Sequence, residues 1–136
     1  VVTIYKRSLK RENIELEIKR SGSPVVAKCT DAVLLQLLIN LFDNAIYWLS
    51  VVEIHDKKIR ITLDGENKQV IFSDNGPGIH PDDVPYIFEA FYSGKEDGRG
   101  LGLYIAHQLL YRMGYSIELA ELKSEKILPG ANFVIN

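Results

Sequence analysis

The spacing of apolar residues predicts three helices in the chain. Apolar positions recur every three or four residues in three segments: 1–10, about 32–50, and 101–113. Thr30 and Asp31 are good N-cap residues for the second segment, and Gly114 is a good end for the third. A fourth, shorter helix is expected at 81–88.

Alternation of apolar and polar residues predicts the strands. It occurs in three segments of the first half of the chain: 13–19, 58–63 and 69–73. The last two are joined by Asp64-Gly65-Glu66-Asn67, a hairpin turn sequence. We also expect strands in three other segments, of which the last two form a closing hairpin: 25–28, 115–122 and 131–135. This order indicates one α/β (α+β) domain over residues 1–136, a two-layer sandwich with helices on one face of a mixed, mostly antiparallel sheet.

The helix predicted at 32–50 is very apolar but carries one polar seam. At about 100° per residue, five residues fall within about a quarter-turn: Gln36, Asn40, Asp43, Asn44 and Tyr47. The opposite side is apolar: Leu34, Leu38, Leu41, Phe42, Ala45 and Leu49. A helix of this kind is expected to be buried, and buried carboxamides are costly unless a polar partner satisfies them. Three kinds of partner could satisfy them: neighbouring backbone, water, or a ligand with a metal ion.

Composition narrows the possible function classes. The 136 residues suffice for one core, with 46% apolar and 25% charged residues and a net charge of −2. No basic field therefore indicates a nucleic-acid or membrane partner. The single cysteine, Cys29, excludes an internal disulfide and a thiol-based metal site, and it fits a reducing compartment. We expect no membrane span and no signal peptide, and the start at Val1 without methionine suggests a fragment of a longer protein.

Asp74-Asn75-Gly76-Pro77-Gly78 follows the predicted strand 69–73 directly. One interpretation is a simple turn, because these residue types favour turns. The other interpretation is chemical. A carboxylate at a strand end can accept a hydrogen bond from an exocyclic amine, as on adenine, and glycines beside it let the backbone approach a flat ring closely. The residues alone leave both interpretations open.

A second glycine-rich segment, Gly98-Arg99-Gly100-Leu101-Gly102, opens the helix predicted at 101–113. The free N–H groups and the dipole of a helix start favour phosphate, although a plain hinge has the same composition. Lys95 and Arg99 are either phosphate contacts or solvated loop residues. The usual dinucleotide and P-loop patterns are absent. Three histidines show no metal-ligand spacing: His55, His80 and His107.

Four motifs in this order resemble the four boxes of the ATP-binding catalytic domain of sensor histidine kinases. They are Asn40-Leu-x-x-Asn44-Ala45, Asp74-x-Gly76-x-Gly78, Ile87-Phe88-Glu89-x-Phe91, and Gly98-x-Gly100-Leu101-Gly102-Leu103. They resemble, in turn, the asparagine box, the first glycine box, the phenylalanine box and the second glycine box. That domain has the Bergerat fold of the GHKL superfamily, shared with DNA gyrase, a heat-shock chaperone family and mismatch-repair ATPases. The resemblance extends from about Lys10 to the end of the chain.

The resemblance implies ATP and Mg²⁺ as ligands and a role for each matching residue. Asn44 is implied as the metal ligand, Asn40 as its neighbour at phosphate, metal or water, and Asp74 as the acceptor of the adenine amine. Phe88 and Phe91 are implied at the base of a flexible ATP lid. We expect catalytic roles for Asn40, Asn44, Lys95 and Arg99. The other expected nucleotide contacts are Asp43, Tyr47, Gly76, Gly78, Ile79, Lys95, Gly98, Arg99, Gly100, Leu101 and Gly102.

The chain departs from the family pattern at two places. Tyr47 stands where these kinases often carry Lys or Arg, so a basic phosphate contact is either missing or supplied by Lys95 or Arg99. The segment that matches the lid, 91–100, is also short, which leaves less chain to cover a nucleotide.

The residue at position 40 bears on the reaction. In the gyrase, chaperone and mismatch-repair branches a Glu at the matching position activates water, whereas Asn40 cannot take a proton at neutral pH. Neutral imidazole is already a nucleophile and needs less help. We therefore expect γ-phosphate transfer to a histidine outside this chain, in two-component signal transduction. Asp43 in the same seam keeps hydrolysis open. The alternatives are a GHKL-type serine protein kinase, an ATPase switch domain, and a docking module with a degenerate pocket.

The expected partners follow from this assignment. They are ATP or ADP, the parent protein's own dimerisation and histidine phosphotransfer domain, and a response regulator. No nucleic-acid partner and no direct membrane contact of this domain are expected. We expect a cytoplasmic location for the domain, whether or not the parent protein is anchored in a membrane.

Overall fold

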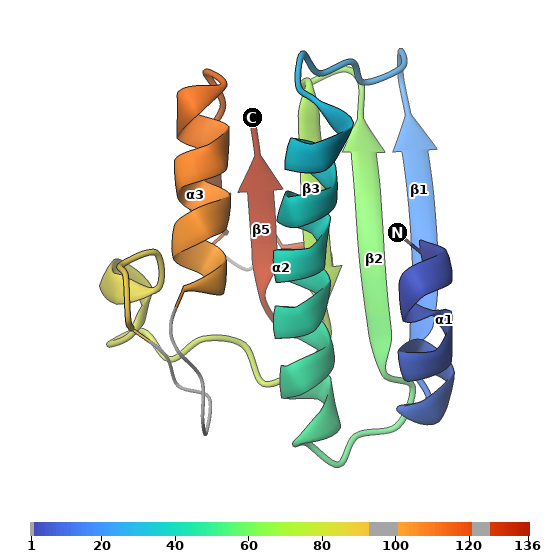
Figure 1. The fold of residues 1–136 in the computed structure, drawn as a ribbon. Coiled ribbons are helices and arrows are strands. Elements are labelled where there is room, and N and C mark those ends of the chain that lie inside the picture. The colour runs from blue at the N-terminus through green and yellow to red at the C-terminus, as the bar shows by residue number, and fades with distance from the viewer. Residues whose placement is uncertain (1, 93–100, 121–125) are drawn as a thin grey trace.

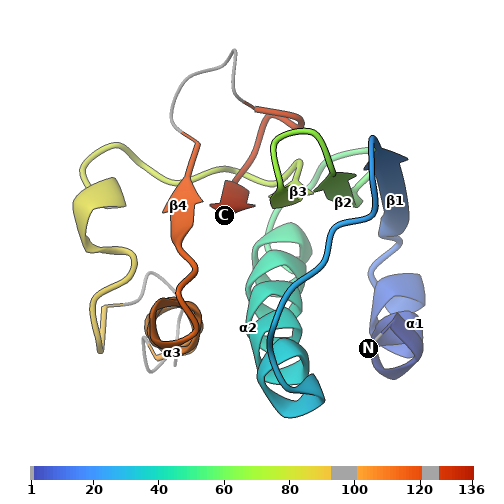
Figure 2. The same cartoon turned by 90° about the horizontal axis from the view of Figure 1, so that it is seen from above.

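A five-stranded sheet forms one of the two layers of the molecule. The computed structural model describes residues 2–92, 101–120 and 126–136. The strand order is β1-β2-β3-β5-β4. Three helices cover one face of the sheet (Figures 1 and 2). The predicted α/β sandwich with a mixed, mostly antiparallel sheet is therefore confirmed.

The strands lie close to where alternation predicted them. They are β1 (Glu15–Ser21), β2 (Lys58–Asp64), β3 (Gln69–Asp74), β4 (Ile117–Leu119) and β5 (Asn132–Ile135). β1 pairs with β2 in parallel, and the other neighbours pair antiparallel. β5 lies between β3 and β4, and its register sets Asn132 opposite Ser73. The start of β5 therefore lies beside the end of β3.

The three helices also match the periodicity. They are α1 (Val2–Arg11), α2 (Asp31–Ser50) and α3 (Gly102–Arg112). Thr30 is the N-cap of α2, and its Oγ1 accepts a hydrogen bond of 3.2 Å from the Val33 N–H. α2 lies between α1 and α3 (Figure 2). It is thus in contact with both flanking helices as well as with the sheet.

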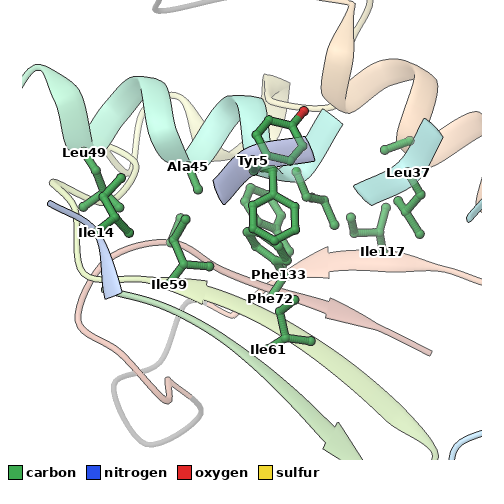
Figure 3. Packing of buried hydrophobic residues seen from close by; sticks show 14 of the residues in the cluster. Tyr5, Ile14, Leu37, Ala45, Leu49, Ile59, Ile61, Phe72, Ile117 and Phe133 are labelled. Carbon is green, nitrogen blue, oxygen red and sulfur yellow. The ribbon is translucent and has the colours of Figure 1, made fainter. Parts of the chain in front are cut away.

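Aromatic packing fixes α2 on the sheet. Phe42 is completely buried, stacks on Tyr5 of α1 with ring centroids 4.9 Å apart, and meets Phe72 of β3 edge-on at 5.1 Å. Ala45 and Leu49 extend the same buried side of α2 (Figure 3). Full burial of each large apolar side chain contributes about 1.5–3 kcal/mol. The core therefore holds the polar side of α2 in a fixed position.

Two predicted elements are wrong. Residues 25–28 form no strand, because Val26 is 84% exposed and the Lys28 N–H donates to the Tyr115 hydroxyl (2.8 Å) rather than to a strand. The helix expected at 81–88 is reduced to a 3₁₀ turn at Val84–Tyr86. Two prolines in that segment lack the amide N–H that a longer helix requires: Pro81 and Pro85.

α2 also corrects two expectations about its own surface. Leu34, predicted on the apolar side, is 44% exposed, because it lies in the first turn of the helix. By length and composition alone α2 is apolar enough to cross a membrane, contrary to the prediction. In the structure the sheet covers its apolar side. Six residues of α2 are buried: Leu37, Leu41, Phe42, Asn44, Ala45 and Leu49. It is therefore the central helix of this core.

Candidate functional site

Asn40 and Asn44 lie one turn apart on α2, and the protein satisfies neither carboxamide completely. Asn44 is only 7% exposed, and its side chain has no hydrogen-bond partner within the described residues. Asn40 Oδ1 accepts a long hydrogen bond of 3.4 Å from Gln36 Nε2. The buried Asn40 Nδ2 has no partner in the described part of the chain. Because unpaired buried amides are costly, this pair fits a polar ligand better than a structural cross-link.

Asp43 faces a different neighbour. Its Oδ1 accepts a hydrogen bond of 2.7 Å from the Tyr5 hydroxyl, which lies 3.3 Å from the Ile39 carbonyl oxygen. Burial, reinforced by the hydrogen bond and charge of Asp43, raises the pKa of Tyr5. The structure thus engages one oxygen of Asp43 with α1. Of the seam residues, Asp43 is the one that forms a hydrogen bond to α1.

Tyr47 lies at the other end of this seam. It is half-buried and packs edge-on against Trp48, with ring centroids 5.1 Å apart. No basic side chain stands at this position of α2.

Asp74 ends β3 as a buried carboxylate, 3% exposed. Its Oδ1 accepts two backbone hydrogen bonds, from Gly76 N (2.9 Å) and Ala131 N (3.3 Å). These bonds leave Oδ2 without a hydrogen bond from the described residues. Burial raises the pKa of Asp74 to about 6, while the two N–H donors and the charge of Lys126 act in the opposite direction. The carboxylate is therefore mostly ionised at neutral pH and ready to accept one further hydrogen bond.

The glycines after Asp74 allow the backbone to pass close to the carboxylate, where a side chain would find little room. A Cβ at Gly76 would lie 3.0 Å from Asp74 Oδ1 and 3.5 Å from Leu49 Cδ2. Gly78 has φ +75°, a conformation that favours glycine. The predicted turn is present here, and the backbone passes close to the Asp74 carboxylate, while its approach to an adenine ring stays a prediction.

The segment before β5 forms a second wall around Asp74, which the sequence motifs did not predict. A Cβ at Gly130 would lie 2.4 Å from Asp74 Oδ1 and 2.7 Å from Gly76 N, so only glycine fits. Gly130 N donates to Asp74 O and Asp74 N donates to Ala131 O, both at 3.0 Å. Asn132, completely buried, hydrogen-bonds back to this segment. A buried asparagine beginning an apolar strand after Pro129-Gly130 is the signal that could have indicated it.

α3 begins beside Asn40. A Cβ at Gly102 would lie 3.8 Å from Asn40 Oδ1. Leu101, the residue before α3, supplies no side-chain cap. As far as the described residues go, no side chain caps α3, so its first N–H groups can receive an anion near the asparagine pair. Four predicted phosphate-side residues lie outside the described residues: Lys95, Gly98, Arg99 and Gly100.

The two predicted lid anchors differ in their environment. Phe88 is half-buried between His107 of α3 (ring centroids 5.5 Å) and Phe133 of β5 (6.2 Å). Phe91 is 78% exposed and has φ +68°, and its role at the base of a lid stays a prediction. Ile79 lines a cavity of about 380 Å³ together with Gly130 and Ala131. The phenylalanine motif therefore supplies one packed residue and one exposed residue.

The site combines three features around α2. They are a pair of carboxamides of which Asn44 is buried and Asn40 half-buried, a helix start next to Asn40 that no described side chain caps, and a buried carboxylate with one available oxygen. An amide oxygen is a ligand that Mg²⁺ accepts, a helix start accepts phosphate, and a carboxylate accepts an amine. The residues present thus fit a nucleotide with its metal ion.

Comparison with known proteins agrees with this arrangement. The family model described as histidine kinase-, DNA gyrase B-, and HSP90-like ATPase matches residues 30–135. This chain belongs to that family. The domain is accordingly a histidine-kinase-type ATP-binding catalytic domain of the GHKL superfamily, as the four motifs predicted.

Named relatives are sensor kinases. The sensor protein CitS of Bacillus subtilis (strain 168) is 31% identical over 121 residues, which cover 89% of this chain and 22% of CitS. The signal transduction histidine-protein kinase ArlS of Staphylococcus aureus (strain USA300) is 37% identical over 108 residues, which cover 74% of this chain and 22% of ArlS. The chain therefore spans about a fifth of the length of these relatives.

A solved structure supports the same fold. Full-length ShkA in complex with AMPPNP superposes with a TM-score of 0.71 at 27% identity, covering 98% of this chain and 27% of ShkA.

Proposed function

We propose that this domain binds Mg-ATP and presents the γ-phosphate to a histidine on another domain of its parent protein. The observation that carries the proposal is the pair Asn40 and Asn44, one turn apart on α2 near the start of α3: among the described residues, neither the buried Asn44 side chain nor Asn40 Nδ2 finds a hydrogen-bond partner. Asn44 would hold the metal ion, α3 and Asn40 would receive the phosphates, and Asp74 would accept the adenine amine. Magnesium, when bound, supplies positive charge that offsets the negative charge of the phosphates.

The side chains of α2 favour transfer over hydrolysis. Hydrolysis needs a group that takes a proton from water, and Asn40 cannot do so. Asp43 is the carboxylate that kept this question open. Its Oδ1 accepts a hydrogen bond from the Tyr5 hydroxyl of α1, which supports a structural role for this carboxylate. An imidazole acceptor needs no strong base, and positioning with charge neutralisation is sufficient for phosphoryl transfer.

Two functions of the same fold remain as rivals. A GHKL-type serine kinase would use the same nucleotide site, but a serine hydroxyl generally requires a base. An ATPase switch would require a base for water. Asn40 cannot serve as that base, and Asp43 accepts a hydrogen bond from the Tyr5 hydroxyl, so these two side chains argue against both alternatives.

The location and partners belong to the same proposal. ArlS is named a signal transduction histidine-protein kinase. By analogy we propose a cytoplasmic domain that acts on its own dimerisation and phosphoacceptor domain, which then passes phosphate to a response regulator.

The proposal is tested by following phosphate and nucleotide together. Purified residues 1–136 should bind Mg-ATP by calorimetry and should acquire little phosphate alone. When the parent protein's acceptor domain is added, acid-labile phosphate should appear on that domain. Acid-stable phosphate on a partner would instead identify a serine kinase, and fast turnover by the isolated domain would identify an ATPase. Absence of Mg-ATP binding at millimolar concentration would leave only a docking role.

A further inference from the structure

We propose that Asn132 is a positioning residue for nucleotide recognition: it holds the segment 127–131 against Asp74 and so fixes the carboxylate that receives the adenine amine. This inference rests on the proposed function of Asp74. It concerns a part of the chain that the four sequence motifs do not include.

The carboxamide of Asn132 uses its full hydrogen-bonding capacity on one short segment. Oδ1 accepts from Ile127 N (2.9 Å) and Leu128 N (3.2 Å). Nδ2 donates to Leu128 O (2.7 Å) and Gly130 O (3.2 Å). An amide has two lone pairs on its oxygen and two N–H donors, so all four are satisfied. Two backbone N–H groups face Oδ1 and two backbone carbonyl oxygens face Nδ2, so the orientation of the carboxamide is fixed.

This segment lies on the face of the sheet opposite the helices, where Figure 2 shows the chain leading into β5. Asn132 is completely buried and stands opposite Ser73, the residue before Asp74. A side chain on β5 therefore anchors a segment that reaches the end of β3. Neither a helix nor a pairing of strands holds residues 127–130 in place.

The anchored segment closes directly on Asp74. Gly130 N donates to the Asp74 carbonyl oxygen at 3.0 Å, and Ala131 N donates to Oδ1 at 3.3 Å. The Gly130 backbone comes so close that a Cβ there would lie 2.4 Å from Oδ1. These contacts exclude water from one side of the carboxylate and hold Oδ1. The orientation of Oδ2, the atom assigned to the adenine amine, is thereby fixed.

The charge state of Asp74 gives this contact a measurable consequence. Burial is the main cause that raises the pKa of Asp74 to about 6. A proton on the carboxylate competes with the adenine amine, so nucleotide affinity should fall as pH decreases through that value. If the segment is released, water reaches the carboxylate and the burial effect weakens; because burial is the largest cause, this outweighs the loss of the Ala131 N–H donor and of the Lys126 charge, which both lower the pKa. The pKa then falls toward its ordinary value, and the loss of affinity should move to lower pH.

A double-mutant cycle separates a positioning role of Asn132 from a general loss of structure. We would measure ADP affinity by calorimetry from pH 5 to 8 for wild type, Asn132→Ala, Asp74→Asn and the double variant. Asn132→Ala should weaken ADP roughly tenfold, comparable to one lost hydrogen bond, and should shift the pH midpoint downward. In the Asp74→Asn background the same change should have little further effect, because residues that act through one another are not additive.

Two further variants complete the experiment. Asn132→Thr suits a strand but cannot replace four hydrogen bonds, so it decides the question if Asn132→Ala does not fold. Asn136→Ala is the matched control, because Asn136 Oδ1 accepts only a surface hydrogen bond from Gln69 Nε2 (2.8 Å) among its side-chain contacts. It should retain the wild-type affinity.

The outcomes test separately the positioning role of Asn132 and the assignment of Asp74 to the adenine amine. Wild-type affinity and pH midpoint in a folded Asn132 variant would overturn the positioning role, as would an equal loss of affinity in both backgrounds. If Asp74→Asn itself binds ADP like wild type, the assignment of Asp74 is wrong, whatever the Asn132 variants do.

Discussion

Replacement of Asn44 by alanine should abolish magnesium-dependent phosphoryl transfer, with a loss of about a hundredfold or more. Asn44 is buried on α2 and its carboxamide has no other hydrogen-bond partner within the described residues. Alanine removes the oxygen that we assign to the metal ion and leaves the apolar side of the helix unchanged. The measurement is the rate of phosphate transfer from labelled ATP in the full-length parent protein, with and without Mg²⁺.

Two control measurements show whether the loss of transfer is specific to metal binding by Asn44. ADP binding without magnesium should survive in Asn44→Ala, because the adenine end of the site is separate. Asn67→Ala removes an exposed asparagine from the β2–β3 turn, where its Nδ2 donates to Asp64 Oδ2 at 2.8 Å. It should transfer phosphate like wild type. Persistent magnesium-dependent transfer in Asn44→Ala would show that another residue holds the metal ion.

Asp74→Asn should weaken adenine nucleotides by about 1.5–3 kcal/mol, or roughly 10- to 150-fold, the value of a hydrogen bond to a charged group. The substitution preserves the shape of the side chain at the end of β3. It removes the negative charge and places an N–H₂ group at one of the two carboxylate oxygen positions. Oδ1 already accepts from Gly76 N and Ala131 N, so the amide would turn its N–H₂ group toward the ligand. A donor would then face the adenine amine.

The control for this variant is a nearby aspartate outside the site. Asp82 has a side chain that is 90% exposed and lies 3.6 Å from His80 Nδ1. Asp82→Asn should leave ATP affinity unchanged, and neither variant should change the weak binding of a guanine nucleotide greatly. Equal affinity of wild type and Asp74→Asn for ATP, measured by calorimetry, would contradict the adenine assignment.

Local pattern predicted the parts of the site that lie on regular elements. The 20-residue helix α2 shows its apolar and polar sides in the sequence, so the placement of Asn40 and Asn44 on the same side could be predicted. Asp74 was identified because a carboxylate and glycines followed a clear strand. The limits of these elements were also predicted to within a few residues, because caps and turns mark them.

Contacts between distant segments could not be predicted in this way. Asp43 was placed in the seam by helical geometry, but Tyr5, 38 residues away, holds it against α1. The wall formed by Gly130 and Ala131 joins Asp74 to a residue 57 positions later. Periodicity describes neighbours on one element and gives no information about which other element will cover it. The roles of Lys95 and Arg99 stay predictions, since both lie outside the described residues.

A crystal structure of this chain with Mg²⁺ and AMPPNP tests the central claim most directly. We expect the Asn44 side-chain oxygen among the metal ligands, and the available Asp74 oxygen at about 3 Å from the adenine amine. If the analogue lies elsewhere, and main-chain groups satisfy both Asn40 and Asn44, the assignment of this site is wrong.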